Sequence, residues 1–149
     1  MPLPIEHYAM IGDCHTAALV GRDGSIDWLC FPHFDSGACL AALLGGPEHG
    51  RWLVAPVAEA ARVRRRYRPG TLILETEFDT AAGCIRVIDF MPLSDERWDV
   101  VRIVEGVSGR VTVGMELIVR FDYGSIVPWV RRAGDWCASS SPKAWALSP

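Results

Sequence analysis

Two short apolar runs around a four-residue turn limit the fold of this chain more than any other feature. The runs are Thr16–Val20 and Ser25–Cys30, and the turn between them is Gly21-Arg22-Asp23-Gly24. An Asp-Gly pair between apolar runs favours a β-hairpin, because both turn residues tolerate positive φ. The sequence therefore predicts that the chain opens as a hairpin.

The segment after this hairpin, Phe31-Pro32-His33-Phe34-Asp35-Ser36, interrupts the strand pattern. Pro32 has no N–H to donate to a sheet ladder, so we expect a loop here. Asp35 or Ser36 can cap a short helical turn, which is predicted over Ala38–Leu44. A carboxylate in such an aromatic loop either caps the turn or faces a partner surface, and capping is the plainer interpretation.

The rest of the chain is predicted to form successive strands bounded by glycine and proline. These strands are Gly50–Ala55, Ala61–Arg68, Thr71–Asp79, Cys84–Phe90, Asp99–Val107 and Val111–Arg120. The middle pair should turn at Thr80-Ala81-Ala82-Gly83, and the last two should form a third hairpin around Ser108-Gly109-Arg110. Alternation within the fourth strand places Ile85, Val87 and Asp89 on one face. Short strands joined by such turns indicate an all-β fold, a sandwich or a barrel, with one helical turn near 38–44.

Length and charge narrow the class of protein. A chain of 149 residues suits one domain. The formal net charge is −3, from 15 basic and 18 acidic residues, and this gives no electrostatic footprint for nucleic acid. One local basic run is explained by a solvated strand face whose alternate side chains point outward. Its members are Arg62, Arg64, Arg65, Arg66 and Arg68.

We expect a soluble, cytoplasmic protein that has no membrane segment. The N-terminal segment MPLPIEHYAM has neither the basic nor the apolar region of a secretory leader, and no later stretch suits a membrane span. The cysteines show no C-x-x-C spacing, which argues against a disulfide framework and a zinc ribbon; they are Cys14, Cys30, Cys39, Cys84 and Cys137. The histidines lack the spacing of metal ligands, so we expect neither a metal nor a cofactor; they are His7, His15, His33 and His49.

Several segments resemble one known family. They are IGDCHTAALVGRDGSIDWLCFP, FDSGACLAALLG, EHGRW, RRRYRPGTLILETEF, IDFMP and RFDYGSIVPWVRR, and the resemblance extends over residues 4–132. These segments are similar to the N-terminal β-domain of bacterial glycoside hydrolase family 15 proteins, the trehalase and glucoamylase-like group. The resemblance implies an antiparallel, supersandwich-like β-sandwich that precedes an (α/α)6 barrel, and the barrel carries two catalytic glutamates in that family. The complete enzyme would hydrolyse α-glucosidic bonds with inversion.

No barrel sequence follows in this chain, and we expect no catalytic residue within it. An inverting glycosidase needs an acid and a base on two carboxyl groups about 6.5–9.5 Å apart. The acidic residues here fit turn, solvated or cross-strand roles; the candidates are Asp23, Asp27, Glu75, Glu77, Asp95 and Glu96. The expected partner is therefore the missing barrel.

If the domain docks on a barrel, we expect the loop after the first hairpin to face it. The residues of this barrel-facing loop are Trp28, Pro32, His33, Phe34, Asp35 and Ser36. The family more often has arginine at the position of His33, which weakens a charge role there. Aromatic side chains can also stack on sugars, but a tryptophan in an alternating strand, such as Trp28, is more often part of the core.

The composition changes near Arg132. The segment Ala133–Pro149 loses strand alternation, gains a Ser-Ser-Ser-Pro turn and no longer resembles the family. We therefore predict a β-sandwich domain over residues 1–132 and an irregular tail over residues 133–149. A truncated or frameshifted reading frame explains such a tail, and a natural stand-alone protein is the alternative.

Three functional hypotheses remain open at this point. The first is a non-catalytic N-terminal domain of a family 15 type enzyme, separated from its barrel. The second is a stand-alone carbohydrate-binding or protein-interaction module, and the third is a degraded reading frame that folds poorly. With its docking surface uncovered, the domain is expected to self-associate.

Overall fold

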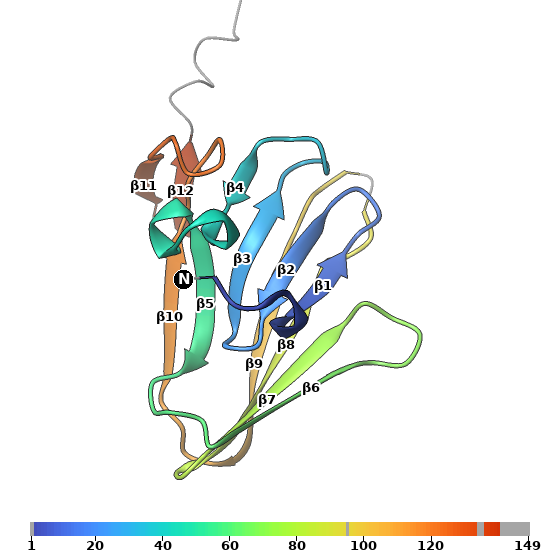
Figure 1. The fold of residues 1–149 in the computed structure, drawn as a ribbon, viewed down its shortest axis with the longest axis vertical. Coiled ribbons are helices and arrows are strands. Elements are labelled where there is room, and N and C mark those ends of the chain that lie inside the picture. Colours follow the sequence, from blue (N-terminus) through green and yellow to red (C-terminus); the bar gives the residue numbers. More distant parts are fainter. Residues whose placement is uncertain (1, 95, 134–135, 141–149) are drawn as a thin grey trace, which may run out of the picture.

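The computed structural model describes residues 2–94, 96–133 and 136–140 and shows two antiparallel β-sheets stacked on each other (Figure 1). The larger sheet has the strand order β1-β2-β3-β5-β10, with β4 also paired to β3. Its strands are β1 (Tyr8–Gly12), β2 (Ala17–Gly21), β3 (Ser25–Cys30), β4 (Ala38–Leu40), β5 (Arg51–Pro56) and β10 (Val113–Ile118).

The smaller sheet has the order β6-β7-β8-β9, and a separate pair is formed by β11 and β12. The bounds are β6 (Arg62–Tyr67), β7 (Leu74–Thr80), β8 (Gly83–Phe90), β9 (Val101–Gly109), β11 (Trp129–Ala133) and β12 (Trp136–Ser140). The helical elements in the described residues are three 3-10 turns, η1 (Ile5–His7), η2 (Ala42–Leu44) and η3 (Pro47–His49). The predicted all-β sandwich is confirmed.

Apolar side chains from both sheets fill the space between them. One cluster of buried residues joins strands of the larger sheet to β7 and to the residue after β8; its members are Ile11, Ala18, Val20, Ile26, Leu29, Leu40, Leu74 and Met91. A second cluster joins β5 to β7 and β8 through Val54, Phe78, Ile85 and Val87. Burying a side chain of this size stabilises the fold by about 1.5–3 kcal/mol, so these clusters hold the two sheets together.

The first predicted hairpin is confirmed as β2 and β3. The amide of Gly24 donates to the carbonyl of Gly21 over 3.0 Å, and Gly24 has a φ of +88°. A Cβ atom on Gly24 would lie 2.3 Å from the carbonyl oxygen of Val54 on β5. Two features therefore require glycine at this position: the left-handed backbone conformation and the close approach of the neighbouring strand.

The predicted pairing of the middle strands is also confirmed, but the third hairpin is wrong. β7 and β8 pair with Thr80 opposite Gly83. β9 pairs with β8 instead of β10, and β10 pairs with β5, so that Met115 lies opposite Val54. Residues 110–112 thus carry the chain from one sheet to the other (Figure 1). A Ser-Gly-Arg turn signals a change of direction, but it does not specify the strand with which the next segment pairs.

The helical turn expected over Ala38–Leu44 is only partly present. Its first three residues form β4, whose Ala38 and Leu40 are buried and pair with β3. The helical part is the 3-10 turn η2, which has an alanine at its N-cap and no side-chain capping bond. Asp35 and Ser36 therefore do not cap a helix, because pairing with β3 satisfies the backbone that a helix would have used.

The segment that was expected to be irregular contains a strand. β12 pairs with β11 so that Trp136 lies opposite Ala133 and Ser140 opposite Trp129. The prediction of an irregular tail therefore fails for residues 136–140, because loss of alternation does not prevent backbone pairing. Residues 134–135 and 141–149 of the tail lie outside the described residues.

The arginine of a buried ion pair also connects the two sheets. Arg102 on β9 donates from Nε to Oδ1 of Asp89 on β8 over 2.8 Å, and both side chains are 1% exposed. The same guanidinium donates to the carbonyl oxygens of Gly24 and Trp52 in the larger sheet. Burial raises the pKa of Asp89, and the hydrogen bond and charge of Arg102 oppose this effect.

Candidate interaction surface

The sandwich is open along the side formed by β9 and β10. Val104 lies opposite fully buried Val87, and Met115 lies opposite buried Val54. Directly opposite residues in an antiparallel pair share a face, so Val104 and Met115 both point toward the interior. They are nevertheless 45% and 71% exposed, and Leu117 on the same face of β10 is 51% exposed.

These residues are exposed because the two sheets end at this side. β9 and β10 are the last strands of their sheets in the described part of the chain. An inward-facing apolar residue at a sheet edge has no strand of the other sheet above it. The interior of the sandwich is therefore accessible from this side, and the exposed side chains are apolar.

A groove of about 430 Å³ lies at one end of this open side. Apolar and aromatic side chains form most of its wall, together with the carboxylate of Asp99. The lining residues are Leu29, Phe31, Gly37, Cys39, Leu40, Trp52, Trp98, Asp99, Val100, Leu117, Val119 and Phe121. Leu117 lines the groove and also belongs to the exposed, inward-facing residues Val104, Met115 and Leu117. The groove and these residues therefore form one surface, which we call the open face.

The structure places part of the predicted barrel-facing loop beside the open face. The ring of His33 packs edge-on against Trp98, with 5.9 Å between the ring centroids, and Trp98 lines the groove. Phe34 is largely exposed, and Asp35 is exposed without a hydrogen bond or ion pair among the described residues. Ser36 closes the loop, since its hydroxyl accepts the amide of His33 over 3.2 Å.

Trp28 and Pro32 stand apart from these exposed residues. Trp28 packs against Tyr123, with 6.0 Å between ring centroids, and against a buried cluster formed by Cys30, Ala38 and Ala41. This cluster is separate from the one that contains Leu29, the next residue of β3. Pro32 is half-buried. The predicted set therefore divides into two groups, His33 to Ser36 near the groove and Trp28 on the other side of β3.

Four of the six carboxylates considered as candidates for acid–base chemistry are engaged in structural contacts; Asp95 lies outside the described residues, and the carboxylate of Glu96 has no contact among them. Asp27 accepts the hydroxyls of Tyr8 and Ser25, and Asp23 accepts the amide of Ser25 over 3.0 Å. Burial, reinforced by the bond to Asp27, raises the pKa of Tyr8. Glu75 accepts two arginines of the β6 region, and Glu77 accepts Arg86.

The sequence did not identify the open face, although it identified the strands that form it. Val113, Met115 and Leu117 alternate as core residues do, and alternation correctly assigns them to one face of β10. Whether that face is covered depends on where the other sheet ends, and no local pattern carries this information. Nothing in the sequence connects Trp98 to the loop at His33, because their contact depends on the fold.

The described residues contain no helix that is long and apolar enough to cross a membrane. No group of three or more histidine, cysteine, aspartate or glutamate side chains in the same residues is arranged to hold a metal ion.

Comparison with known proteins gives a consistent result. A family model described as "Trehalase-like, N-terminal" matches residues 1–136. The chain is 35% identical over 140 residues to a trehalase of Mycolicibacterium smegmatis, covering 80% of this chain and 21% of that protein. It is 33% identical over 139 residues to a trehalase of Mycobacterium tuberculosis, covering 80% and 20%.

An archaeal relative shows the same pattern. Trehalase 1 of Sulfolobus acidocaldarius is 31% identical over 133 residues, which cover 89% of this chain and 22% of that protein. The chain thus spans about a fifth of the length of the curated relatives it matches. No solved structure matches the chain.

Proposed function

The chain belongs to the trehalase-like N-terminal family, and from this we propose that it is the non-catalytic N-terminal domain of a longer glycoside hydrolase. The relatives are named trehalases and are about five times longer than the matched region. We assign the protein to the family 15 type, in which the domain precedes an (α/α)6 barrel. The domain unit would begin at residue 1 and end near residue 136, where the family match ends, a few residues after the predicted boundary at Arg132.

The open face is the observation that carries this proposal. Apolar patches larger than a few hundred Å² are unusual on monomeric proteins and mark interaction sites. Here Val104, Met115 and Leu117 point toward the interior and are still exposed, which suits a domain that is completed by further chain. We propose that the catalytic domain covers this face, together with His33 and Phe34 of the adjacent loop.

The chemistry of the described residues supports a positioning role. In the complete enzyme, two carboxyl groups on the barrel, about 6.5–9.5 Å apart, would act as acid and base and cleave the α-glucosidic bond with inversion. In this chain Asp27, Glu75 and Glu77 each accept hydrogen bonds from neighbouring side chains. A carboxylate held in this way serves the fold, and so we assign no catalytic residue to the domain.

The state of the cysteines supports a cytoplasmic location for this protein. The cysteines whose side chains are described are all free, namely Cys14, Cys30, Cys39 and Cys84. Burial raises the pKa of Cys30 and Cys84, and it raises the pKa of Cys39 to about 12. Free thiols of this kind are typical of a reducing compartment.

A chimaera tests the docking proposal directly. The matched N-terminal fifth of the M. smegmatis trehalase would be replaced by residues 1–136 of this chain, the span that the family model matches, and trehalose hydrolysis and solubility would be measured. We expect a soluble and active chimaera. Met115→Lys should lower both properties at least about tenfold, because it places a charge in an apolar interface.

The control lies on the same strand. Glu116→Lys introduces the same side chain on the opposite face of β10 and breaks only the exposed pair with Arg51, so activity should stay within about twofold. An inactive chimaera beside an active parent enzyme would overturn the proposal, as would equal effects of the two lysine variants.

A carbohydrate-binding module is the second candidate, and the exposed ring of Trp98 in the groove favours it. Aromatic rings in grooves can stack on sugar rings. Quenching of tryptophan fluorescence by trehalose or maltooligosaccharides, lost in Trp98→Ala, would support this function. The DNA that follows codon 132, read in three frames, separates the two candidates, since only the first requires a catalytic domain there.

A further inference from the structure

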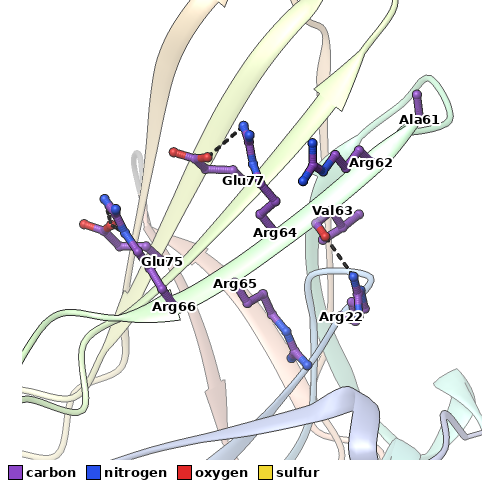
Figure 2. Close-up of a pocket in the computed structure, with 9 residues that line it drawn as sticks. All are labelled: Arg22, Ala61, Arg62, Val63, Arg64, Arg65, Arg66, Glu75 and Glu77. Atoms are coloured by element: carbon purple, nitrogen blue, oxygen red, sulfur yellow. Dashed lines mark hydrogen bonds and ion pairs between the residues drawn. The ribbon is translucent and has the colours of Figure 1, made fainter.

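A second groove, distinct from the open face, runs along the edge strand of the smaller sheet. β6 is the first strand of that sheet, and its residues form one wall of a groove of about 980 Å³. Arg22, from the turn between β2 and β3, lies on the other side, and Glu75 and Glu77 of β7 complete the lining. Figure 2 shows these side chains around β6.

The charge of this groove is opposite to that of the chain. Five arginines and two glutamates line it, which gives a local charge of +3 in a chain with a formal net charge of −3. The arginines are Arg22, Arg62, Arg64, Arg65 and Arg66. A concave surface lined mainly by one sign of charge concentrates ligands of the opposite sign.

Two of the five arginines are neutralised within the sheet. Arg64 lies 3.0 Å from Glu77 and 3.2 Å from Asp79, and Arg66 lies 2.8 Å from Glu75. Both side chains extend toward the carboxylates of β7 (Figure 2). These pairs fasten β6 to β7 and leave the positive charge of the groove to the other three arginines.

The other three arginines have no carboxylate partner among the described residues. Arg22 donates to the carbonyl of Val63 over 2.9 Å, and Arg65 donates to the carbonyl of Val20 over 3.1 Å. The guanidinium of Arg62 makes no hydrogen bond or ion pair among the described residues. A guanidinium has five N–H donors, so Arg22 and Arg65 are anchored by one bond each and keep most donors for a ligand. Burial, and then the charge of Arg22, lower the pKa of Arg65, and an anion between the two would relieve their repulsion.

The backbone of β6 narrows the class of ligand. The amide of Arg68 donates to the carbonyl of Ile73, and this register makes the even-numbered residues of β6 the ones that bond β7. The odd-numbered residues therefore turn their N–H and C=O groups to the free edge. The carbonyl of Val63 confirms this, since it accepts Arg22 from across the groove. An extended peptide can pair with such an edge, whereas a nucleic acid or a free carboxylate cannot.

We propose that the β6 groove binds an extended acidic segment of a partner protein. The segment would lie along the six residues of β6, a length of about 20 Å. Carboxylates at every second position would project on one side, about 7 Å apart, where guanidinium groups can donate to them in bidentate pairs. Arg62 supplies free charge on the side of β6 that also carries Arg64 and Arg66, and Arg22 supplies it on the other side, at the carbonyl of Val63 (Figure 2). The edge groups of Arg65 and Tyr67 are open to the backbone of the segment.

Fluorescence anisotropy on the full chain tests this proposal. The probe is a labelled ten-residue peptide that alternates glutamate and threonine, and the matched probe alternates lysine and threonine. We expect binding of the glutamate peptide that weakens as salt is raised, and no binding of the lysine peptide. Arg62→Glu and Arg22→Glu should each weaken binding by at least about tenfold, since each reverses a charge that faces the ligand.

Arg110→Glu is the matched control, because Arg110 is exposed outside the groove and its replacement makes the same change in net charge. It should change the affinity by less than about twofold. Arg62→Gln, which removes the charge without reversing it, should give an intermediate loss. Circular dichroism and the melting temperature confirm that each variant is folded.

Four outcomes would overturn the proposal. One is no binding of the glutamate peptide at millimolar concentration, and another is equal binding of the lysine peptide. The third is a loss of affinity in Arg110→Glu as large as in Arg62→Glu. The fourth is a preference for anions in general, shown either by equally tight binding of an oligothymidylate of the same charge or by displacement by succinate at equal carboxylate concentration.

Discussion

At the scale of single residues, the guanidinium of Arg102 is bonded to both layers of the sandwich. It pairs with Asp89 in its own sheet and donates to the carbonyls of Gly24 and Trp52 in the other. It also lies 5.3 Å from the centre of the Trp52 ring, where the electrons of the ring attract a cation. Two buried charges are tolerated here because each satisfies the other and the remaining donors reach backbone oxygens.

Arg102→Met is therefore expected to destabilise the protein by about 3–5 kcal/mol, since it leaves the carboxylate of Asp89 buried and unpaired. Urea unfolding followed by tryptophan fluorescence gives this free energy. Arg97→Met removes an arginine whose side chain is 80% exposed and should cost less than about 0.5 kcal/mol. The double variant Asp89→Leu/Arg102→Met should be more stable than Arg102→Met alone, and failure of this recovery would contradict the role assigned to the pair.

The sequence indicates that Asp89 is buried, but it does not identify Arg102 as its partner. Alternation placed Asp89 on the same face as Ile85 and Val87, and that face is the core. The partner was not found, because Arg102 belongs to a strand whose assignment to β8 depends on the sheet order. A carboxylate on a core face does indicate that a cation is near, and this signal was present in the sequence.

At the scale of elements, the outer face of the smaller sheet is joined by ion pairs that cross all four of its strands. Arg64 of β6 pairs with Glu77 of β7, which also accepts Arg86 of β8 over 2.7 Å. Arg86 in turn pairs with Glu105 of β9 over 2.9 Å. An isolated exposed pair contributes little, but charges that share partners in a network are held more firmly.

The network makes stability depend on acid pH. Hydrogen bonds from Arg86, and then the charges of Arg64 and Arg86, lower the pKa of Glu77 against the effect of burial. The folded state therefore holds fewer protons than the unfolded state just below the unfolded pKa of about 4.3. The stabilisation is complete above that pH and is lost as the pH falls through the folded pKa.

Glu77→Gln should thus lower the melting temperature near pH 7 and reduce the further loss of stability between pH 5 and pH 3, relative to the unaltered chain. Melting curves across this range measure both effects. Glu59→Gln is the control, because Glu59 is exposed and has no ion pair among the described residues. Parallel pH profiles for the unaltered chain and Glu77→Gln would show that the network does not contribute.

Elements were predicted well where the signal is local. The hairpins at Gly24 and at Gly83 follow from turn residues between apolar runs, and both are present. β4 was expected to be helical, because Ala38–Leu44 has helix-forming residues and its pairing with β3 is not a local property. The third hairpin failed for the same reason, since β9 and β10 are adjacent in sequence but belong to different sheets.

At the scale of the whole molecule, the open face is the main feature that sets this domain apart from a closed sandwich. Apolar side chains at Val104, Met115 and Leu117 lie next to two sheet edges with unpaired backbone groups. Such edges template pairing with another chain. The family resemblance predicted a docking surface, but the sequence placed it only at the loop near His33. The open face was missed because the edge of each sheet depends on the strand order of the whole fold.

The chain is expected to self-associate at tens of micromolar and to bind a hydrophobic dye. Both follow from an exposed apolar interior beside free strand edges. Light scattering and dye fluorescence measure them, and Met115→Lys should reduce both while Glu116→Lys, on the other face of β10, should not. A monomer that binds no dye would mean that the open face is too small to act as an interface.

The passage of the chain between the sheets also has a kinetic consequence. β5 pairs with β10, and all four strands of the smaller sheet lie between these two strands in the sequence. Completing the larger sheet therefore closes a loop that contains the whole smaller sheet, since Val54 pairs with Met115 some sixty residues later. Loop closure of this length precedes any gain from pairing, so folding should be slow, roughly in the range of milliseconds to seconds. We therefore expect the two sheets to form in one cooperative step, and we expect that a chain cut between them would not give two halves that fold independently.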